Sequence, residues 1–146
     1  MQGPVGVAGI IPQGRTVLVL RRSHADRFLP GAYDLPGGGL EPGESPDEGI
    51  RREALEKTGL HTTIVRTLGS RSYLVDPHSG RQDKTLIVYL LKVTDGKFGI
   101  SLSKEHDKYR WVSDLDLGEI FGSGDLMRGI IHEYFVHPVE SDGLGR

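Results

Sequence analysis

Two glutamates three residues apart, Glu53 and Glu56, are the side chains of this chain best suited to chemistry. On a helix, residues at this spacing are neighbours, with Cβ atoms about 5–6 Å apart. Paired carboxylates suit a divalent cation such as Mg²⁺, which prefers oxygen ligands. Arg52 directly precedes Glu53, and a guanidinium can hold a carboxylate in a fixed orientation through paired hydrogen bonds. The pattern therefore favours metal-assisted chemistry on an anionic substrate.

Glycines precede these acids, in the run Gly37 to Gly39. Because glycine has no Cβ, its backbone can approach a ligand closely, and a carbonyl of Gly37 or Gly38 could be a further metal ligand. A bound metal neutralises phosphate charge and activates water. Glycines and acids together suit the attack of water on a phosphorus atom.

All of these residues except Gly37 lie within one stretch, residues 38–60, which reads GGLEPGESPDEGIRREALEKTGL. This stretch resembles the Nudix box, G-x5-E-x7-R-E-U-x-E-E-x-G-U, where U is aliphatic. The positions in register are Gly38, Glu44, Arg52, Glu53, Ala54, Glu56, Gly59 and Leu60. The resemblance implies an enzyme that cuts nucleoside diphosphates linked to another group. It also implies Mg²⁺ or Mn²⁺ as cofactor, Glu53 and Glu56 as metal ligands, and Arg52 as the residue that orients a glutamate.

Lys57 breaks the pattern, because the family usually has its last glutamate there. An ammonium has no acceptor lone pair and opposes a nearby divalent ion. Three interpretations follow. The side chain could swing out to solvent and leave a weaker metal site. The ammonium could replace the charge of one metal and contact phosphate itself. The site could also be inactive, so that the domain only binds its ligand.

Three further residues are candidates for the site. Glu105 lies in a segment similar to a Nudix loop that carries an acid near the metals, so it could be a ligand or the general base. Arg22, at a strand end, could contact phosphate or base. Tyr33 could stack on a nucleobase, although packing in the core or at its rim is the alternative.

The resemblance implies a function as well. The expected activity is that of a MutT-like nucleoside triphosphate pyrophosphohydrolase, which gives a nucleoside monophosphate and pyrophosphate. One alternative is a catalytically impaired nucleotide-binding or sensor module. Another is an ADP-ribose or nucleotide-sugar pyrophosphatase, for which Pro77 is a weak indication.

The elements that must position these residues can be placed from sequence patterns. Ser45, Pro46 and Glu48 form a helix start and Gly59 a helix stop, which predicts a helix over 46–58 with Ile50, Ala54 and Thr58 facing the core. A second helix is expected over 126–136. Apolar and β-branched runs predict strands over 5–11, 16–20, 33–35, 62–75, 85–93 and 109–112. Strands flanked by two helices indicate an α/β/α sandwich, as the resemblance also implies.

Composition bounds the remaining possibilities. The 146 residues fit a single domain, which we expect over 1–137, with a disordered tail over 138–146. A net charge of −2 gives no strong attraction for nucleic acid or anionic membrane. The absence of cysteine excludes disulfides and thiolate chemistry and fits a reducing cytoplasm. We therefore expect a cytoplasmic monomer or homodimer whose partner is a small nucleotide.

Overall fold

Two β-sheets form the centre of the protein in a computed structural model, which describes residues 4–24, 30–75 and 82–137. The first sheet has the strand order β5-β1-β7-β6. Its strands are β1 (Val5–Ile10), β5 (Gly37–Gly39), β6 (Thr62–Val75) and β7 (Gln82–Val93). β1 and β7 are parallel, and the other pairs are antiparallel.

The second sheet is arranged around β3 (Thr16–Arg22). This strand pairs antiparallel with β2 (Pro12–Gln13), β4 (Tyr33–Asp34) and β8 (His106–Val112). The pairing of β3 with β8 shifts register between Arg21 and Arg22, at the end of β3. Because the two strands are antiparallel, the start of β8, next to Glu105, lies beside the end of β3.

Helix α1 (Pro46–Thr58) has the predicted bounds. The Ser45 hydroxyl accepts a hydrogen bond from the Glu48 amide, and the Glu48 carboxylate accepts one from the Ser45 amide, which completes a capping box. Gly59 ends the helix in the left-handed conformation, at φ 76°. Helix α3 (Leu126–Val136) is also confirmed, and Asp125 caps it. A 3₁₀ turn, η1 (Asp114–Asp116), and a short helix, α2 (Leu117–Ile120), were not predicted.

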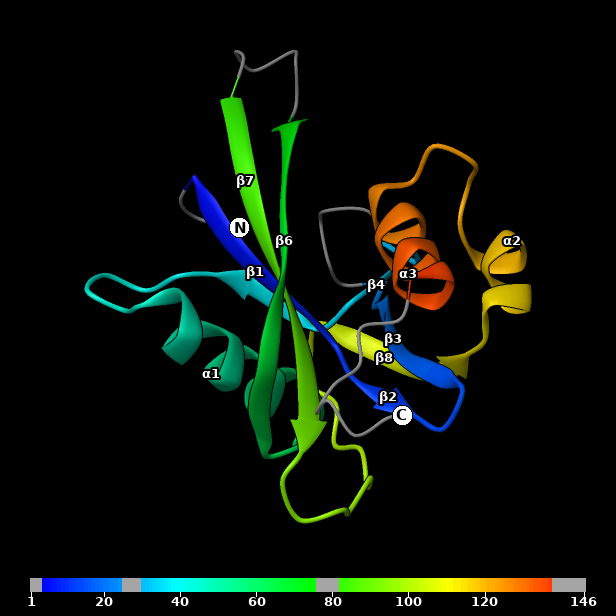
Figure 1. Ribbon diagram of the computed structural model, residues 1–146, viewed down its shortest axis with the longest axis horizontal. Helices are drawn as coiled ribbons and strands as arrows, with labels where there is room; N and C mark the ends of the chain where they lie inside the picture. Colours follow the sequence, from blue (N-terminus) through cyan, green and yellow to red (C-terminus); the bar gives the residue numbers. More distant parts are fainter. Residues whose placement is uncertain (1–3, 25–29, 76–81, 138–146) are drawn as a thin grey trace.

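The two long helices cover opposite faces of the first sheet (Figure 1). On the α1 side, Ile50 and Ala54 pack with Val7, Tyr89 and Leu91. The core on the other side includes residues of β1, β7 and α3, among them Ala8, Val88, Ile130 and Ile131. These three layers confirm the predicted α/β/α sandwich. No helix in the described ranges is long and apolar enough to cross a membrane.

Several strands extend beyond their predicted bounds, and two short strands, β2 and β5, were not predicted. The glycines 37–39, for which no strand was predicted, form β5 and pair with β1. A Cβ on Gly37 would lie 2.9 Å from Ala8 Cα and would clash with the Val7 carbonyl oxygen, so only glycine permits this approach. β8 begins three residues before the predicted start, and β7 likewise. The predicted tail and Pro77 lie outside the described residues, so the predictions about them stay untested.

Candidate active site

Helix α1 places Glu53 against the glycines of β5. The buried residues Ile50, Ala54 and Thr58 fix the rotation of the helix on the sheet. Glu53 is only 6% exposed, although it is an acid. A Cβ on Gly38 would lie 2.6 Å from the Glu53 carboxyl carbon. The glycine is therefore required so that the carboxylate can lie directly over the backbone of β5.

Arg52 connects the acids of the site. Its guanidinium donates two hydrogen bonds to Glu44, at 2.6 and 2.9 Å, in the bidentate geometry typical of arginine. The same group donates to Glu53 Oε2 at 3.1 Å and to Glu56 Oε1 at 3.1 Å. A further bond reaches the Gly39 carbonyl at 3.0 Å and ties the helix to β5. The predicted orienting role of Arg52 has a direct geometric basis in these contacts.

Glu44 is the main partner of Arg52. Hydrogen bonds from Arg52, together with one from the Glu41 amide at 2.9 Å, lower the pKa of Glu44 to about 2. The carboxylate is therefore ionised at neutral pH. The geometry makes Glu44 a partner of Arg52, because both of its oxygens are already engaged in hydrogen bonds.

The Glu53 carboxylate lies in a less favourable environment. Burial raises its pKa above the ordinary value, and the charges of Lys57 and Arg52 act in the opposite direction. Oε2 accepts the bond from Arg52, but Oε1 is buried without a hydrogen-bond partner among the described residues. The Lys57 ammonium, at 3.9 Å from Oε1, forms an ion pair with it. Arg52 thus holds Glu53 in place through Oε2, while Oε1 accepts no hydrogen bond from the described residues.

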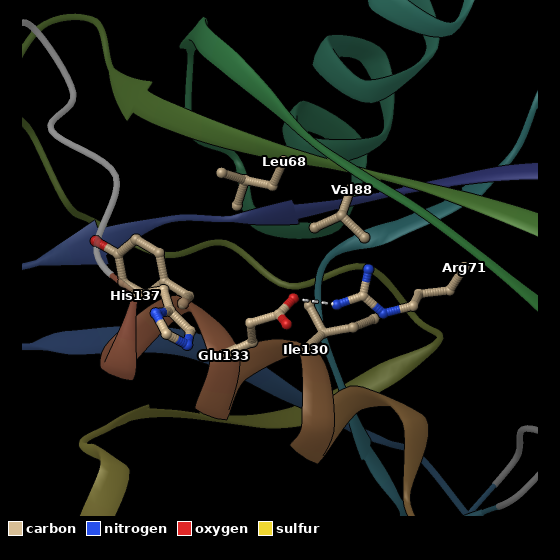
Figure 2. A pocket seen from close by; sticks show the side chains of 7 residues that line it. Leu68, Arg71, Val88, Ile130, Glu133 and His137 are labelled. Carbon is tan, nitrogen blue, oxygen red and sulfur yellow. Dashed lines mark hydrogen bonds and ion pairs between the residues drawn. The ribbon is translucent and has the colours of Figure 1, made fainter.

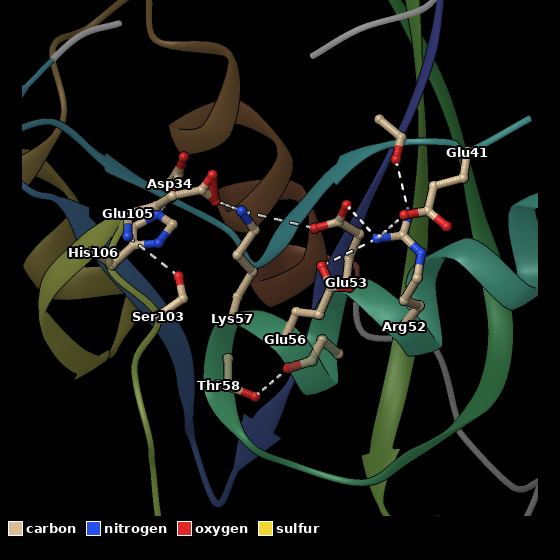
Figure 3. Close-up of polar contacts among 12 residues, drawn as sticks. Asp34, Glu41, Arg52, Glu53, Glu56, Lys57, Thr58, Ser103, Glu105 and His106 are labelled. Atoms are coloured by element: carbon tan, nitrogen blue, oxygen red, sulfur yellow. Dashed lines mark hydrogen bonds and ion pairs between the residues drawn. The ribbon is translucent and has the colours of Figure 1, made fainter. Parts of the chain in front are cut away.

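Lys57 points into the site, contrary to the interpretation in which it swings out to solvent. Its side chain is only 14% exposed, and its ammonium forms ion pairs with Glu53 and Glu105. Figure 3 shows Lys57 between these two acids, with Arg52 on the far side of Glu53. Spacing i+4 places Lys57 one turn from Glu53 on the same face of the helix, and the pair with Glu105 keeps its ammonium there.

The segment that carries Glu105 is attached to the second sheet independently of Lys57. The Ser23 amide donates to the Glu105 carbonyl at 2.9 Å, and the Ser23 hydroxyl donates to the Lys104 carbonyl at 3.1 Å. Next to it, His106 is buried, and its Nε2 lies 3.1 Å from Asp34 Oδ1. The Glu105 carboxylate itself is half exposed, so water can reach it.

The oxygens around Glu53 have the chemistry of Mg²⁺ or Mn²⁺ ligands, but their arrangement does not fit a bound ion. Within the described part of the chain, no three or more His, Cys, Asp or Glu side chains are grouped so that they could hold a metal. One oxygen of Glu56 is bonded to Arg52, and Lys57 lies beside the available oxygen of Glu53. An ion held by these acids would require Lys57 to move.

The remaining predicted site residues lie in the second sheet. Arg22 forms an ion pair with Asp34 at 2.9 Å and is therefore engaged with an acid rather than solvated. Tyr33 is partly buried and packs against the core on the α3 side. Asp34, Ser23 and His106 were not predicted, and only the position of His106 next to Glu105 could have indicated its involvement.

A separate hollow of about 250 Å³ lies on the other face of the first sheet. Its apolar walls are formed by Leu68, Val88 and Ile130, and the pair Arg71–Glu133 crosses it at 2.5 Å (Figure 2). None of the predicted site residues lines this hollow. The acids of α1 are therefore the candidate site.

A comparison with protein families agrees with this geometry, since residues 2–132 match the model of the NUDIX domain. The chain belongs to the Nudix family. The prediction of a Nudix hydrolase, an enzyme acting on phosphoric anhydride bonds, is thereby confirmed at the level of the family. Nudix hydrolases generally use divalent metals.

Individual Nudix relatives are similar at modest identity. A protein named nucleoside triphosphatase NudI from Klebsiella pneumoniae (strain 342) is 32% identical over 106 residues, covering 68% of this chain and 74% of that protein. NudI from Escherichia coli O81 (strain ED1a) is 28% identical over 116 residues, covering 76% and 82%. The crystal structure of the MutT protein from Methanosarcina mazei Go1 superposes with a TM-score of 0.71 at 27% identity, covering 93% and 96%.

Proposed function

We propose that this Nudix protein is a nucleoside triphosphate pyrophosphohydrolase, which releases a nucleoside monophosphate and pyrophosphate. The observation that carries the proposal is the buried Glu53 carboxylate, held over Gly38 by Arg52. The substrate class is supported by the two relatives named nucleoside triphosphatase. A nucleotide as the small-molecule partner follows from the same relatives.

The cofactor we propose is Mg²⁺ or Mn²⁺, which would neutralise phosphate charge and activate water when bound. Glu53, Glu56 and a carbonyl of Gly37 or Gly38 would hold it once Lys57 had moved away from Glu53. In this arrangement Arg52 acts as a positioning residue, since it fixes the carboxylate of Glu53 and bonds Glu56 as well. The chain's contribution is a set of carboxylates held in fixed positions by Arg52, to which the metal would attach.

Glu105 is our preferred general base, with Glu53 as the alternative. A base must lie within hydrogen-bond reach of the attacking water. Glu105 is half exposed and forms an ion pair with Lys57, whereas Glu53 is buried. The Glu105 carboxylate would accept a proton from the water molecule as the water oxygen attacks phosphorus.

Substrate contacts are proposed for Lys57, Arg22 and Tyr33. Lys57 could reach a phosphate oxygen from its place between the acids. Arg22 lies at the end of β3, where Asp34 orients it. Tyr33 neighbours Asp34 on β4 and could contribute its ring to the nucleoside.

The test is a panel of nucleoside triphosphates, ADP-ribose, nucleotide sugars and dinucleoside polyphosphates, assayed with Mg²⁺ and with Mn²⁺. We expect triphosphate turnover that Glu53→Gln lowers by about 100-fold or more. The matched control is Glu119→Gln, at an exposed glutamate on α2, which should leave turnover unchanged. Turnover confined to ADP-ribose or nucleotide sugars would replace our substrate class.

A second candidate function is favoured by Lys57, whose ammonium lies where a metal would be expected. In that case the domain binds or senses a nucleotide without cutting it. An inert wild type that gains turnover in Lys57→Glu would establish this alternative. Cytoplasmic location and a monomeric or homodimeric state stay predictions, to be tested by fractionation and light scattering.

A further inference from the structure

The contacts of Lys57 suggest a role that the family pattern does not contain. Its ammonium is the cation beside Glu53 Oε1, the buried oxygen that lacks a hydrogen-bond partner among the described residues. The same ammonium pairs with Glu105, from a different part of the chain. One lysine thus bridges two carboxylates, as a bound cation would.

The pair with Glu105 is not needed to attach its segment to the fold. Ser23 already holds that segment with two hydrogen bonds, and His106 next to it contacts Asp34. Nor is the lysine a solvated surface charge, because its side chain is 14% exposed. The remaining role is electrostatic: the ammonium balances charge where two carboxylates approach each other.

A positive charge at this place opposes a second one. A divalent ion between Glu53 and Glu105 would meet the ammonium at a few ångströms, and it would compete for the same oxygens. The other oxygen of Glu53 is bonded to Arg52, as are Glu44 and Glu56. Among the residues that the structure describes, no set of acids therefore offers a metal its ligands without displacing Lys57.

We propose that Lys57 is a built-in cation that keeps the free protein from holding a divalent ion, so that metal enters together with the nucleotide's phosphates. The second half of this statement rests on the proposed function, and the first half does not. Phosphate oxygens would supply the ligands that the protein lacks, and they would also give the ammonium a new anionic partner. The chain would thus bind a metal–nucleotide complex rather than bind metal first.

The experiment measures Mn²⁺ uptake by electron paramagnetic resonance of the free ion, with no nucleotide present. Wild type and Lys57→Arg, which keeps the charge, should show no saturable uptake up to millimolar Mn²⁺. Lys57→Gln should bind Mn²⁺ at least about tenfold more tightly than wild type, because the substitution removes the opposing charge. Lys57→Glu should bind more tightly again, because it adds an oxygen ligand. The matched control, Lys92→Gln at an exposed lysine on β7, should behave as wild type.

Two results would overturn the inference. One is saturable uptake by free wild type as tight as that of Lys57→Gln. The other is no uptake by Lys57→Gln and Lys57→Glu, once circular dichroism has shown that both are folded. A last arm adds a non-hydrolysable triphosphate analogue, and wild type should then take up Mn²⁺ beyond the amount that the analogue binds without protein. No such excess would overturn the entry of metal with nucleotide. Failure of the proposed function is seen separately, as absent hydrolysis, and leaves the free-protein result standing.

Discussion

Replacing Gly38 with alanine tests the placement of Glu53 directly. The added Cβ would lie 2.6 Å from Glu53 Cδ and Oε2 and 2.7 Å from Oε1. To reach an ordinary contact of 3.4 Å, the carboxyl group must move by about 0.8 Å. This group is the end of a flexible side chain, so it can move, but its 3.1 Å bond to Arg52 would be strained.

The expected effect of Gly38→Ala is large on activity and small on stability. A misplacement of about 1 Å in a catalytic group can cost roughly 100-fold in rate. Loss of one hydrogen bond costs about 1 kcal/mol, and the change from glycine to alanine returns about 0.4–1 kcal/mol through the unfolded state. We therefore expect kcat/KM to fall about 100-fold and the free energy of unfolding to change by less than about 1 kcal/mol.

The assay is triphosphate hydrolysis at saturating Mg²⁺ or Mn²⁺, with urea unfolding measured on the same preparations. The matched control is Gly129→Ala on α3, where a Cβ meets nothing within 4 Å. This control should keep full activity and gain about 0.5–1 kcal/mol, as expected for alanine inside a helix. If Gly38→Ala hydrolysed triphosphates at the wild-type rate, the carboxylate of Glu53 over β5 could not be part of the reaction.

Three further predictions follow from the same contacts. Gly37→Ala should destabilise the fold by about 3 kcal/mol or more, because its Cβ would clash with the backbone of Val7, which cannot move as a side chain can; urea unfolding measures this. Arg52→Lys should lower kcat/KM about 10–100-fold, since lysine cannot bond two carboxylates in a fixed fork. The control is Arg51→Lys, at an exposed position. Equal activity of the two variants would contradict the positioning role of Arg52. Glu44 has a pKa of about 2, below its ordinary value, so its stabilising contribution is complete above about pH 4.5 and lost as pH falls toward 2. The stability difference between wild type and Glu44→Gln should therefore shrink between pH 5 and pH 3, and a difference constant over that range would refute this assignment.

The parts of the site that follow local rules were predictable from sequence. The bounds of α1 follow from the capping box of Ser45 and Glu48 and from the left-handed Gly59. The alignment of Arg52 with Glu53 follows from the box pattern. These features depend on residues a few positions apart, and the chemistry of those positions leaves few alternatives.

The parts that depend on distant partners were not predictable. Strand β5 consists of three glycines, which have no strand preference of their own, and it forms because β1 lies beside it. The pair between Lys57 and Glu105 depends on how β8 aligns with β3, which no pattern within either segment encodes. The direction of the Lys57 side chain was open for the same reason, since a long side chain can extend into solvent or toward an acid.

The helix restricts what the change to lysine can do. Position 57 is one turn from Glu53 on the same face, so its side chain begins inside the site whatever residue stands there. Counting Glu44, Glu53, Glu56 and Glu105 against Arg52 and Lys57, the site carries a formal charge of −2. With glutamate at position 57 the same count gives −4. The site of this chain therefore repels a triphosphate less than a site with glutamate at position 57 would. The lysine that weakens metal binding by the free protein thus also lowers the cost of bringing polyphosphate to it.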